Sequence, residues 1–434
     1  MHTDDAPSKN IAKYKDIETL LSLIETFQQE NPILDFTNHK SVTQSFRIVA
    51  YQQFDYQEQF YKSIISRQLI IYLKLKSRLD IDSQFEKVTR IGLSNFFRYI
   101  FFTFAFVNRD QFQKGHNYQG FLNNDFITFF TETFTFSELE NFLKLLTIYE
   151  PKDFEPLQKL KDEKLQLYET NFFITKPFLY YNGHYHLPHR AILNQTLKHY
   201  VYTCLKSALP DAFPEEFGKR MEKYVQLGLK EGFFDYQNES ELKRLYDLTK
   251  VSDYRVDQDI LIECKATELH PRSGVLRLPN ILTKELNSSI VKAYQQLLCT
   301  AKAIDADREW FGIIVTYREM YLGFGQDAWD EFLQAPLEEF LLEQNLSITI
   351  LPPQNLFFIT IEDWDYIVQI VKDKNATLKE ILLKARETNV SSNPGDRLFL
   401  MEMVLQKFFK IESLKLSYLE GVFEQYVYPA SLND

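Results

Sequence analysis

The segment from Val251 to Thr267 predicts a tight β-hairpin. Residues 251–256 and 260–267 are short runs rich in β-branched and aromatic side chains, and the turn-forming tripeptide Asp257-Gln258-Asp259 separates them. Two such runs with so short a connection are expected to pair as antiparallel strands. The length of the loop then determines which side chains share a face of the hairpin.

A three-residue loop pairs Val256 with Ile260, and counting back along both strands places Asp253 opposite Glu263. Because side chains alternate along a strand, Lys265 lies on the same face as these two carboxylates. The opposite face is apolar and consists of Ile260, Ile262, Cys264 and Ala266. The sequence therefore predicts two acidic groups and one ammonium on one side of a hairpin.

Two carboxylates facing each other across a ladder repel, so a cationic group must compensate. A divalent cation held by Asp253 and Glu263, with Lys265 alongside, meets this need, since hard cations take oxygen ligands. No thiolate or imidazole on this face would select zinc, so Mg²⁺ is favoured, with Mn²⁺ as a substitute. The alternative is a solvated hairpin face with an ordinary Glu-x-Lys, and the short pattern alone does not decide between them.

Two helices and one strand are predicted around the hairpin. Residues 214–230 have apolar side chains at helical spacing, and Glu222 lies off that stripe. Residues 289–304 form a second amphipathic helix whose polar side carries Lys292, Gln295 and Gln296. The apolar run FGIIVTY, at 311–317, predicts a buried strand.

This order of elements resembles the PD-(D/E)XK nuclease superfamily, which has the restriction-endonuclease-like fold, over roughly residues 205 to 320. The resemblance implies that Asp253 and Glu263 hold the metal and that Lys265 positions or activates the attacking water. It also implies that Glu222 is the helix acid and that the backbone carbonyl of Cys264 is a further metal ligand. The implied reaction is Mg²⁺-dependent hydrolysis of phosphodiester bonds.

The family pattern is not matched at every position. Ser252 stands where the motif name has Pro, and Gln296-Leu297 matches a Gln-Leu pair that some members carry. Thr300 stands where those members have Tyr. We favour Gln296 over Gln295 as the glutamine of the site.

Basic residues follow the Glu-x-Lys motif. Between Lys265 and Lys292 the cationic side chains are Arg272, Arg277, Lys284 and Lys292, with His270, against Glu268 and Glu285. We expect Arg272 and Arg277 to contact phosphates, with Lys284 and Lys292 on the same nucleic-acid-binding surface. The alternative is a merely solvated loop. A net charge of −11 argues against a protein that coats nucleic acid generally.

The predicted class is α/β: a restriction-endonuclease-like core, with a mixed sheet flanked by helices, a large N-terminal all-α domain and a helical C-terminal tail. The boundaries are 1–165 for the helical domain, 166–204 for a connecting hairpin and helix, 205–363 for the core and 364–434 for the tail. In the connecting segment, Asn182-Gly183 predicts a two-residue turn that pairs Tyr181 with His184. The spacing of His184, His186 and His189 also permits zinc binding. Ordinary surface histidines are favoured, because no acidic or thiol ligand is nearby.

Three further local predictions concern the flanking regions. Ser137 with Glu140 predicts a capping box before an apolar stripe, residues 346–350 and 356–361 predict strands, and residues 363–387 predict helix. The last segment, from Arg397 onward, is expected to be amphipathic helix.

Cellular setting and partners follow from composition. Cys204, Cys264 and Cys299 form no CxxC pair, which favours a reducing cytoplasm. No signal peptide is expected, and the most apolar run, 99–107, is too short to span a bilayer. We expect a nucleic-acid substrate, no membrane, and a protein partner or a second copy of the chain bound through the helical domains.

The function that these observations favour is a metal-dependent nuclease, with DNA favoured over RNA. By analogy with the family, it would act in prokaryotic defence against phage or mobile DNA. Two alternatives remain: a catalytically inactive nucleic-acid-binding or adaptor protein on the same fold, and a protein-interaction scaffold with a coincidental Glu-x-Lys. Magnesium discriminates, because the scaffold should not respond to it.

Overall fold

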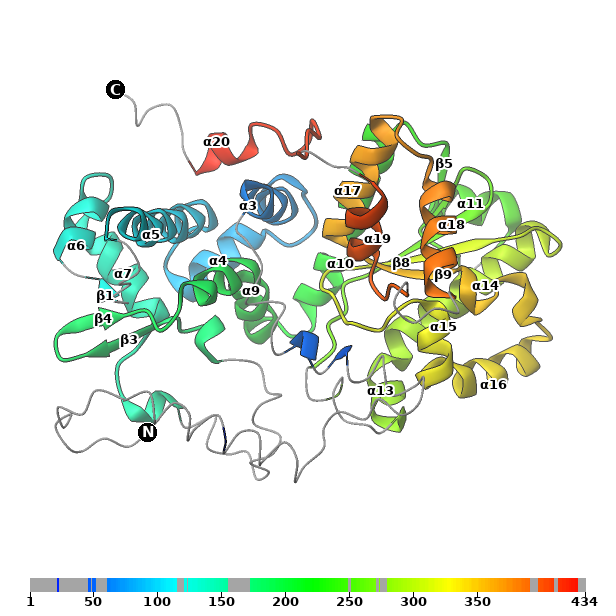
Figure 1. The fold of residues 1–434 in the computed structure, drawn as a ribbon, viewed down its shortest axis with the longest axis horizontal. Coiled ribbons are helices and arrows are strands. Elements are labelled where there is room, and N and C mark those ends of the chain that lie inside the picture. Colours follow the sequence, from blue (N-terminus) through cyan, green and yellow to red (C-terminus); the bar gives the residue numbers. More distant parts are fainter. Residues whose placement is uncertain are drawn as a thin grey trace.

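The computed structural model describes residues 22, 46–47, 49–51, 61–114, 121–122, 124–154, 172–248, 251–270, 273, 279–390, 397–409 and 413–427. The protein is mixed α/β with two small mixed sheets, which confirms the predicted class at that level. Helices with the first sheet form one body, and the second sheet with its own helices forms the other (Figure 1). In the described part of the chain, no helix is long and apolar enough to cross a membrane.

The first body is built from helices that pack through aromatic side chains. Phe96, Phe130 and Phe142 are fully buried, and the ring of Phe142 lies 6.5 Å from that of Phe96 and 6.2 Å from that of Phe130. Such aromatic packing accounts for the high phenylalanine content of this region. The elements are α3 (Lys62–Leu69), the π-helical turn η1 (Ile70–Lys74), α4 (Ile81–Thr89), α5 (Leu93–Lys114), α6 (Asn124–Thr131), α7 (Phe136–Leu146), η2 (Pro151–Phe154), η4 (Phe172–Ile174) and α9 (Arg190–Ala208).

The start of α7 differs from the prediction. The capping box is formed by Thr135 and Glu138, two residues before the predicted pair Ser137 and Glu140. Thr135 accepts a hydrogen bond from the Glu138 amide, and Glu138 accepts one from the Thr135 amide. Both pairs have the required spacing, and the helix begins two residues earlier than predicted, with exposed Phe136 as its first residue.

A four-stranded sheet lies at the edge of this body, in the order β1-β4-β3-β2. Its strands are β1 (Phe121–Leu122), β2 (Thr147–Ile148), β3 (Phe178–Tyr181) and β4 (His184–His186). Tyr181 pairs with His184, which confirms the predicted turn at Asn182-Gly183. The prediction that residues 1–165 are wholly α-helical is wrong, because β1 and β2 add two-residue strands to the edges of this hairpin.

The second body is organised around a five-stranded sheet in the order β5-β6-β7-β8-β9. The β5–β6 and β6–β7 pairs are antiparallel, whereas β7–β8 and β8–β9 are parallel. The strands are β5 (Tyr236–Asn238), β6 (Tyr254–Val256), β7 (Ile260–Lys265), β8 (Phe311–Thr316) and β9 (Leu356–Thr360). The helices up to β9 are α10 (Ala212–Glu231), α11 (Glu239–Tyr246), α13 (Pro279–Leu286), α14 (Lys292–Asp305), α15 (Gly325–Ala328) and α16 (Gln334–Gln344), with η5 (Asn287–Val291) continuous between α13 and α14 and η6 (Trp329–Leu333) before α16.

The two faces of this sheet bury different side chains. Ile260, Ile262 and Cys264 belong to the large core shared with α10 and α17 (Ile361–Lys372). Leu261 and Ile314, on the other face, pack in a second core with α13, α14 and α16. Alternation along β7 therefore places Glu263 and Lys265 on the α14 side.

The C-terminal third departs from the sequence predictions at three points. Residues 348–350 form a 3-10 turn, η7 (Ile348–Ile350), followed by η8 (Pro353–Asn355), so the predicted strand at 346–350 is wrong while β9 is confirmed. The predicted single helix at 363–387 is two helices, because Lys374 has φ 57° and Thr377 caps α18 (Leu378–Asn389) with Glu380. Among residues 397–409 and 413–427, the described part of the last segment, only α19 (Met401–Phe408) and α20 (Val422–Tyr426) are α-helical.

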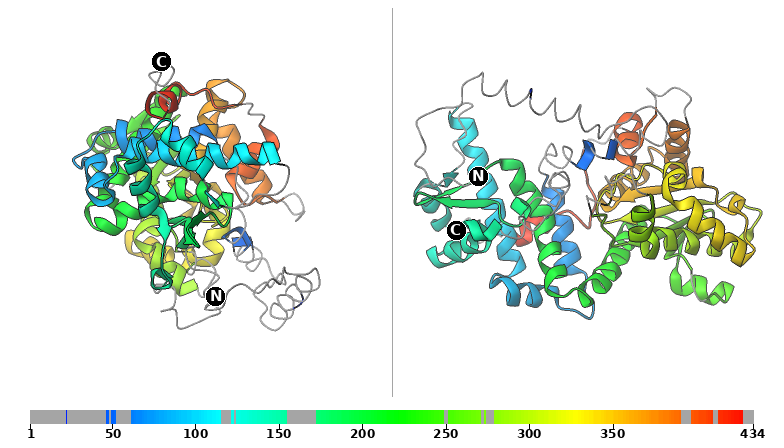
Figure 2. Two further views of the ribbon diagram at one scale, coloured as in Figure 1. Left: turned by 90° about the vertical axis from the view of Figure 1, so that its left-hand side faces the viewer. Right: turned by 90° about the horizontal axis from the view of Figure 1, so that it is seen from below.

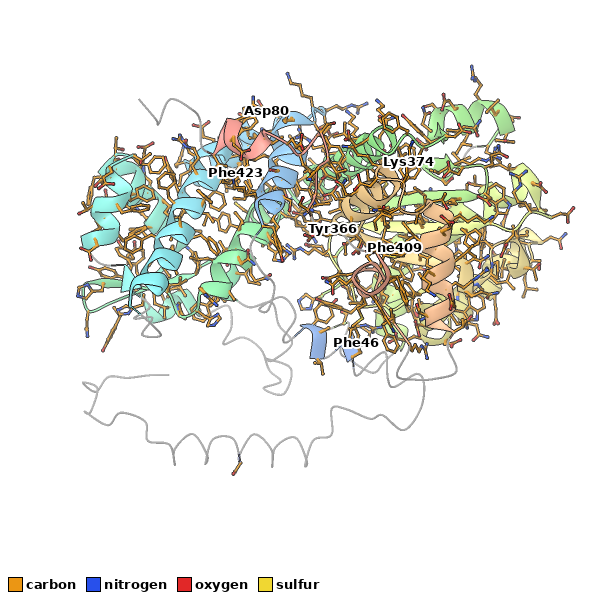
Figure 3. The ribbon with its side chains drawn as sticks, turned by 45° about the horizontal axis from the view of Figure 1, so that its top comes forward. Phe46, Asp80, Tyr366, Lys374, Phe409 and Phe423 are labelled. Atoms are coloured by element: carbon orange, nitrogen blue, oxygen red, sulfur yellow. The ribbon has the colours of Figure 1, made fainter. Side chains whose placement is uncertain are left out.

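Two segments that are far apart in the sequence, α20 and residues 46–47, each pack against a different body. α20 packs on α3, and the Phe423 ring lies 4.8 Å from the ring of Phe101 in α5. Figure 3 labels Phe423 on this returning segment and Phe46 beside the other body. Phe46 stacks on Phe399, with 5.6 Å between ring centroids, and Arg47 donates to Glu331 at 2.9 Å. The right-hand view in Figure 2 shows the same division into two bodies.

Candidate functional site

The hairpin β6–β7 has the predicted register. Val256 pairs with Ile260 and Tyr254 with Ile262, so the next pair in the ladder is Asp253 and Glu263. The loop closes because Asp257 and Gln258 take positive φ angles of 46° and 71°. The two carboxylates therefore face each other across the strands.

Each carboxylate is bound by the backbone of the opposite strand. Asp253 Oδ2 accepts from the Cys264 amide at 2.7 Å, and Glu263 Oε2 accepts from the Asp253 amide at 3.3 Å. Lys265 Nζ lies 2.5 Å from Glu263 Oε1 and donates to Gln296 Oε1 at 3.2 Å. Asp253, Glu263, Lys265 and Gln296 thus meet at one place, from two strands and one helix.

The two departures from the family pattern contact each other. The Ser252 amide donates to Thr300 Oγ1 at 2.9 Å, and Thr300 Oγ1 donates to the Gln296 carbonyl at 2.8 Å. A proline at 252 could not make the first bond, because it has no N–H. Gln296 Nε2 also donates to the Val251 carbonyl at 3.3 Å, so α14 is bound to the residues that lead into Asp253.

Sequence reasoning missed the role of Thr300. The available signal was its spacing of one helical turn from Gln296, which puts both on neighbouring positions of one helix side. In the sequence alone, Thr300 stands out only as a departure from the tyrosine of the family pattern.

We predict that Thr300→Val lowers the free energy of unfolding by about 1–3 kcal/mol, because the buried Ser252 amide loses its acceptor. Urea denaturation measures this. Thr300→Ser, which keeps the hydroxyl, is the control and should retain most of the stability. Equal stability of Thr300→Val and wild type would mean that the bond contributes nothing.

Glu222 approaches the cluster from α10. Its backbone carbonyl accepts from the Tyr254 hydroxyl at 2.9 Å, which holds this turn of the helix against β6. Burial, and then the charge of Asp253, raise the pKa of Glu222 to about 7. The helix acid is therefore close enough to Asp253 for their charges to interact.

The strand carboxylates also hold their protons tightly. Burial raises the pKa of Asp253 to about 6, against the lowering effect of the Cys264 amide and Lys265. Burial and then the charge of Asp253 raise the pKa of Glu263 to about 8. Burial disfavours the Lys265 ammonium, but Glu263 outweighs it, and the pKa of Lys265 is raised. Three acidic groups with raised pKa values therefore surround a single lysine.

The polar face is less open than the sequence suggested. Glu263 is 2% exposed, and the Lys265 side chain is 21% exposed. Glu263 is closed off from solvent because α14 packs over the same side of β7. Asp253 and Lys265 are partly exposed.

The donor set fits a hard cation. Asp253 and Glu263 offer carboxylate oxygens, while the Cys264 side chain lies on the core face. In the described residues, no group of three or more His, Cys, Asp or Glu side chains is arranged to hold a metal. Mg²⁺ commonly uses only one or two protein carboxylates, with water and substrate phosphates completing its shell, so two facing carboxylates are compatible with it.

The predicted phosphate contacts are placed only in part. Arg272 and Arg277 lie outside the described residues. Lys292 is exposed and stands one turn before Gln296 on α14, so it lies on the side of the helix that reaches the cluster. Lys284 is exposed on α13, and the π-helical turn η5 separates it from α14.

No family model, curated protein or solved structure matches this chain.

Proposed function

We propose that this protein is a metal-dependent nuclease that hydrolyses phosphodiester bonds of nucleic acid, with DNA favoured over RNA. The observation that carries the proposal is the meeting of Asp253, Glu263, Lys265 and Gln296, with Lys265 Nζ bonded to both Glu263 and Gln296. The order of elements along the chain also supports the proposal. The chain runs through α10, β5–β7, α14 and β8, which is the order on which the resemblance to the PD-(D/E)XK superfamily is based.

In this proposal Asp253 and Glu263 hold Mg²⁺, with the Cys264 carbonyl and Glu222 as further candidate ligands and Mn²⁺ as a substitute. When bound, the ion supplies positive charge that polarises the scissile phosphate and acidifies a bound water. The raised pKa values of the carboxylates support this assignment, because a bound cation offsets the burial that chiefly raises them and, at Glu263, the charge of Asp253.

Lys265 has a role that its own environment defines. Its raised pKa keeps it protonated, so it acts as a hydrogen-bond donor and a positive charge, not as a proton acceptor. An ammonium held by Glu263 and Gln296 can stabilise negative charge that develops on a phosphoryl oxygen. Gln296 positions it, and Thr300 positions α14 against the strand that carries Asp253.

The second candidate is a nucleic-acid-binding or adaptor protein without catalysis. One observation favours it: the Lys265 ammonium and the buried Glu263 carboxylate already satisfy each other. Both candidates place the protein in the cytoplasm, consistent with its three free cysteines, and defence against phage or mobile DNA is the setting that the family resemblance suggests.

The test is a cleavage assay with the purified full-length chain. Linear DNA, circular DNA and RNA are each incubated with Mg²⁺, with Mn²⁺ or with a chelator. We expect cleavage with either ion and none with the chelator. Binding without cleavage under every condition would favour the adaptor. A chain that neither binds nor cleaves, and whose thermal stability ignores Mg²⁺, would be the scaffold.

A further inference from the structure

A second group of charged side chains lies next to Lys265, at the carboxyl ends of the parallel strands. Lys265 pairs with Thr316 across β7 and β8, and Arg318 follows Thr316 by two residues. Glu268 follows Lys265 by three residues, a span of at most about 11 Å. This edge is where open α/β sheets commonly bind ligands.

Helix α9 brings a lysine and a tyrosine to the same place. Lys206, in its last turn, lies 3.2 Å from Glu268 Oε2, and Arg318 Nε lies 2.8 Å from Glu268 Oε1. One carboxylate therefore holds two cations from separate elements. Both cations also lie over the ring of buried Tyr202, with Lys206 Nζ and the Arg318 guanidinium each 5.5 Å from its centroid.

Tyr202 connects this group to the candidate site. Its hydroxyl donates to the carbonyl of Ala266, the residue directly after Lys265, at 3.3 Å. The Tyr202 side chain therefore contacts both cations and the backbone that directly follows the Glu-x-Lys motif.

Positive charge is in excess here. Lys206 and Arg318 share the single charge of Glu268, and burial, with the charges of Arg318 and Lys198, lowers the pKa of His199 well below its usual range. The Arg318 Nη2 atom is buried in this structure and has no hydrogen-bond partner among the described residues. Lys206 is 48% exposed and Arg318 25% exposed, so solvent reaches both side chains.

We propose that Lys206 and Arg318 bind backbone phosphates of the nucleic-acid strand that lies beside Lys265, and that Glu268 orients both cations before the strand arrives. The inference deepens the proposed function and rests on it. A guanidinium suits a phosphate oxygen, and a partly exposed ammonium adds a second contact. Nucleic acid would then cross the edge formed by α9, β7 and β8.

The test is binding without cleavage. A short fluorescein-labelled duplex DNA, its single strand and an RNA of the same sequence are titrated with the full-length protein in chelator, and in Ca²⁺, across a salt series. The variant is Lys206→Gln with Arg318→Gln. The control, Lys302→Gln with Lys384→Gln, removes the same net charge from exposed or partly exposed positions on α14 and α18.

On duplex DNA we expect the double variant to flatten the slope of log affinity against log salt by about 1.8, since each lost phosphate contact removes ~0.9. Affinity near 0.1 M salt should fall by about tenfold or more, while the control changes little. If the wild type binds and both variants match it, the inference is overturned and the proposed function stands. If the wild type neither binds nor cleaves any of the three probes, both the inference and the proposed function are overturned.

Arg318 is part of an ion pair, so its removal could unfold the chain. Thermal unfolding of the variant detects this. In that case the test uses Lys206→Glu, with Lys302→Glu as its control, because about half of the Lys206 side chain is exposed. Weaker binding by Lys206→Glu alone supports the proposal, and equal binding by both reversals overturns it.

Discussion

Cleavage by the Lys265→Ala variant is expected to fall by about 10²–10³-fold, to a level that most assays report as none. Lys265 Nζ is held by Glu263 Oε1 and Gln296 Oε1, and its raised pKa keeps it charged. An alanine leaves developing phosphoryl charge without that ammonium. The rate of product formation with Mg²⁺ measures the effect.

The variant should remain folded, which separates a chemical effect from a structural one. Removing Lys265 leaves Glu263 buried beside Asp253, but the pKa of Glu263 is already raised to about 8, so that carboxyl can take up a proton instead. Glu263→Gln is expected to lose cleavage for the complementary reason, because it removes a metal-binding oxygen while keeping the shape.

Lys379→Ala is the matched control. Lys379 Nζ lies 2.5 Å from Asp259 Oδ2, in the loop of the same hairpin, so the variant removes another lysine–carboxylate pair from β6–β7. We expect it to cleave normally. Normal cleavage by Lys265→Ala, or an equal loss in Lys379→Ala, would show that the assigned site is not the catalytic one.

Without divalent ions, the free energy of unfolding is expected to fall as pH rises from about 4.5 to about 8. The folded protein binds protons at Glu263, Glu222 and Asp253 more tightly than the unfolded chain does. The free energy of unfolding therefore decreases as pH rises through this window.

Mg²⁺ should reverse this trend, because it binds the deprotonated carboxylates. We expect Mg²⁺ to raise stability at about pH 8.5 and to have little effect at about pH 5, where protons compete with it. The Asp253→Asn, Glu263→Gln double variant should be more stable than wild type at about pH 8.5 without metal, and it should ignore Mg²⁺. Urea denaturation at both pH values, with Mg²⁺ or chelator, measures all of these changes.

Asp363→Asn controls for buried carboxyls in general. Burial raises the pKa of Asp363, on α17, to about 8, and its partners are the Thr360 amide and hydroxyl that begin this helix. This variant should also change the pH dependence but keep the full response to Mg²⁺. A wild-type protein whose stability ignores Mg²⁺ at the higher pH would argue against an ion at Asp253 and Glu263.

The site could be predicted well because it depends on local rules. A three-residue loop and the alternation of side chains were enough to place Asp253 opposite Glu263 and to put Lys265 beside them. Helical spacing was enough to turn Gln296 of α14 away from the buried stripe that contains Tyr294 and Leu297. The β7–β8 pairing was not needed for either step.

What sequence could not supply came from contacts between distant segments. The sequence predicts that a metal compensates for the two facing carboxylates. The structure shows backbone donors as well, because the Cys264 and Asp253 amides each donate to a carboxylate across the hairpin. Thr300 became important only because Ser252 lies against it. Local competition explains other errors: Thr377 starts a new helix inside an apolar pattern that looks continuous.

The contact between α20 and α3 bears on the order of events during synthesis. Residues 422–426 are synthesised after the whole of the second sheet, yet Phe423 covers Phe101 of α5 and Lys62 of α3. The first body therefore lacks part of its apolar cover until α20 has been synthesised. A nascent chain would keep that surface open to chaperones until then, which delays completion of the helical body.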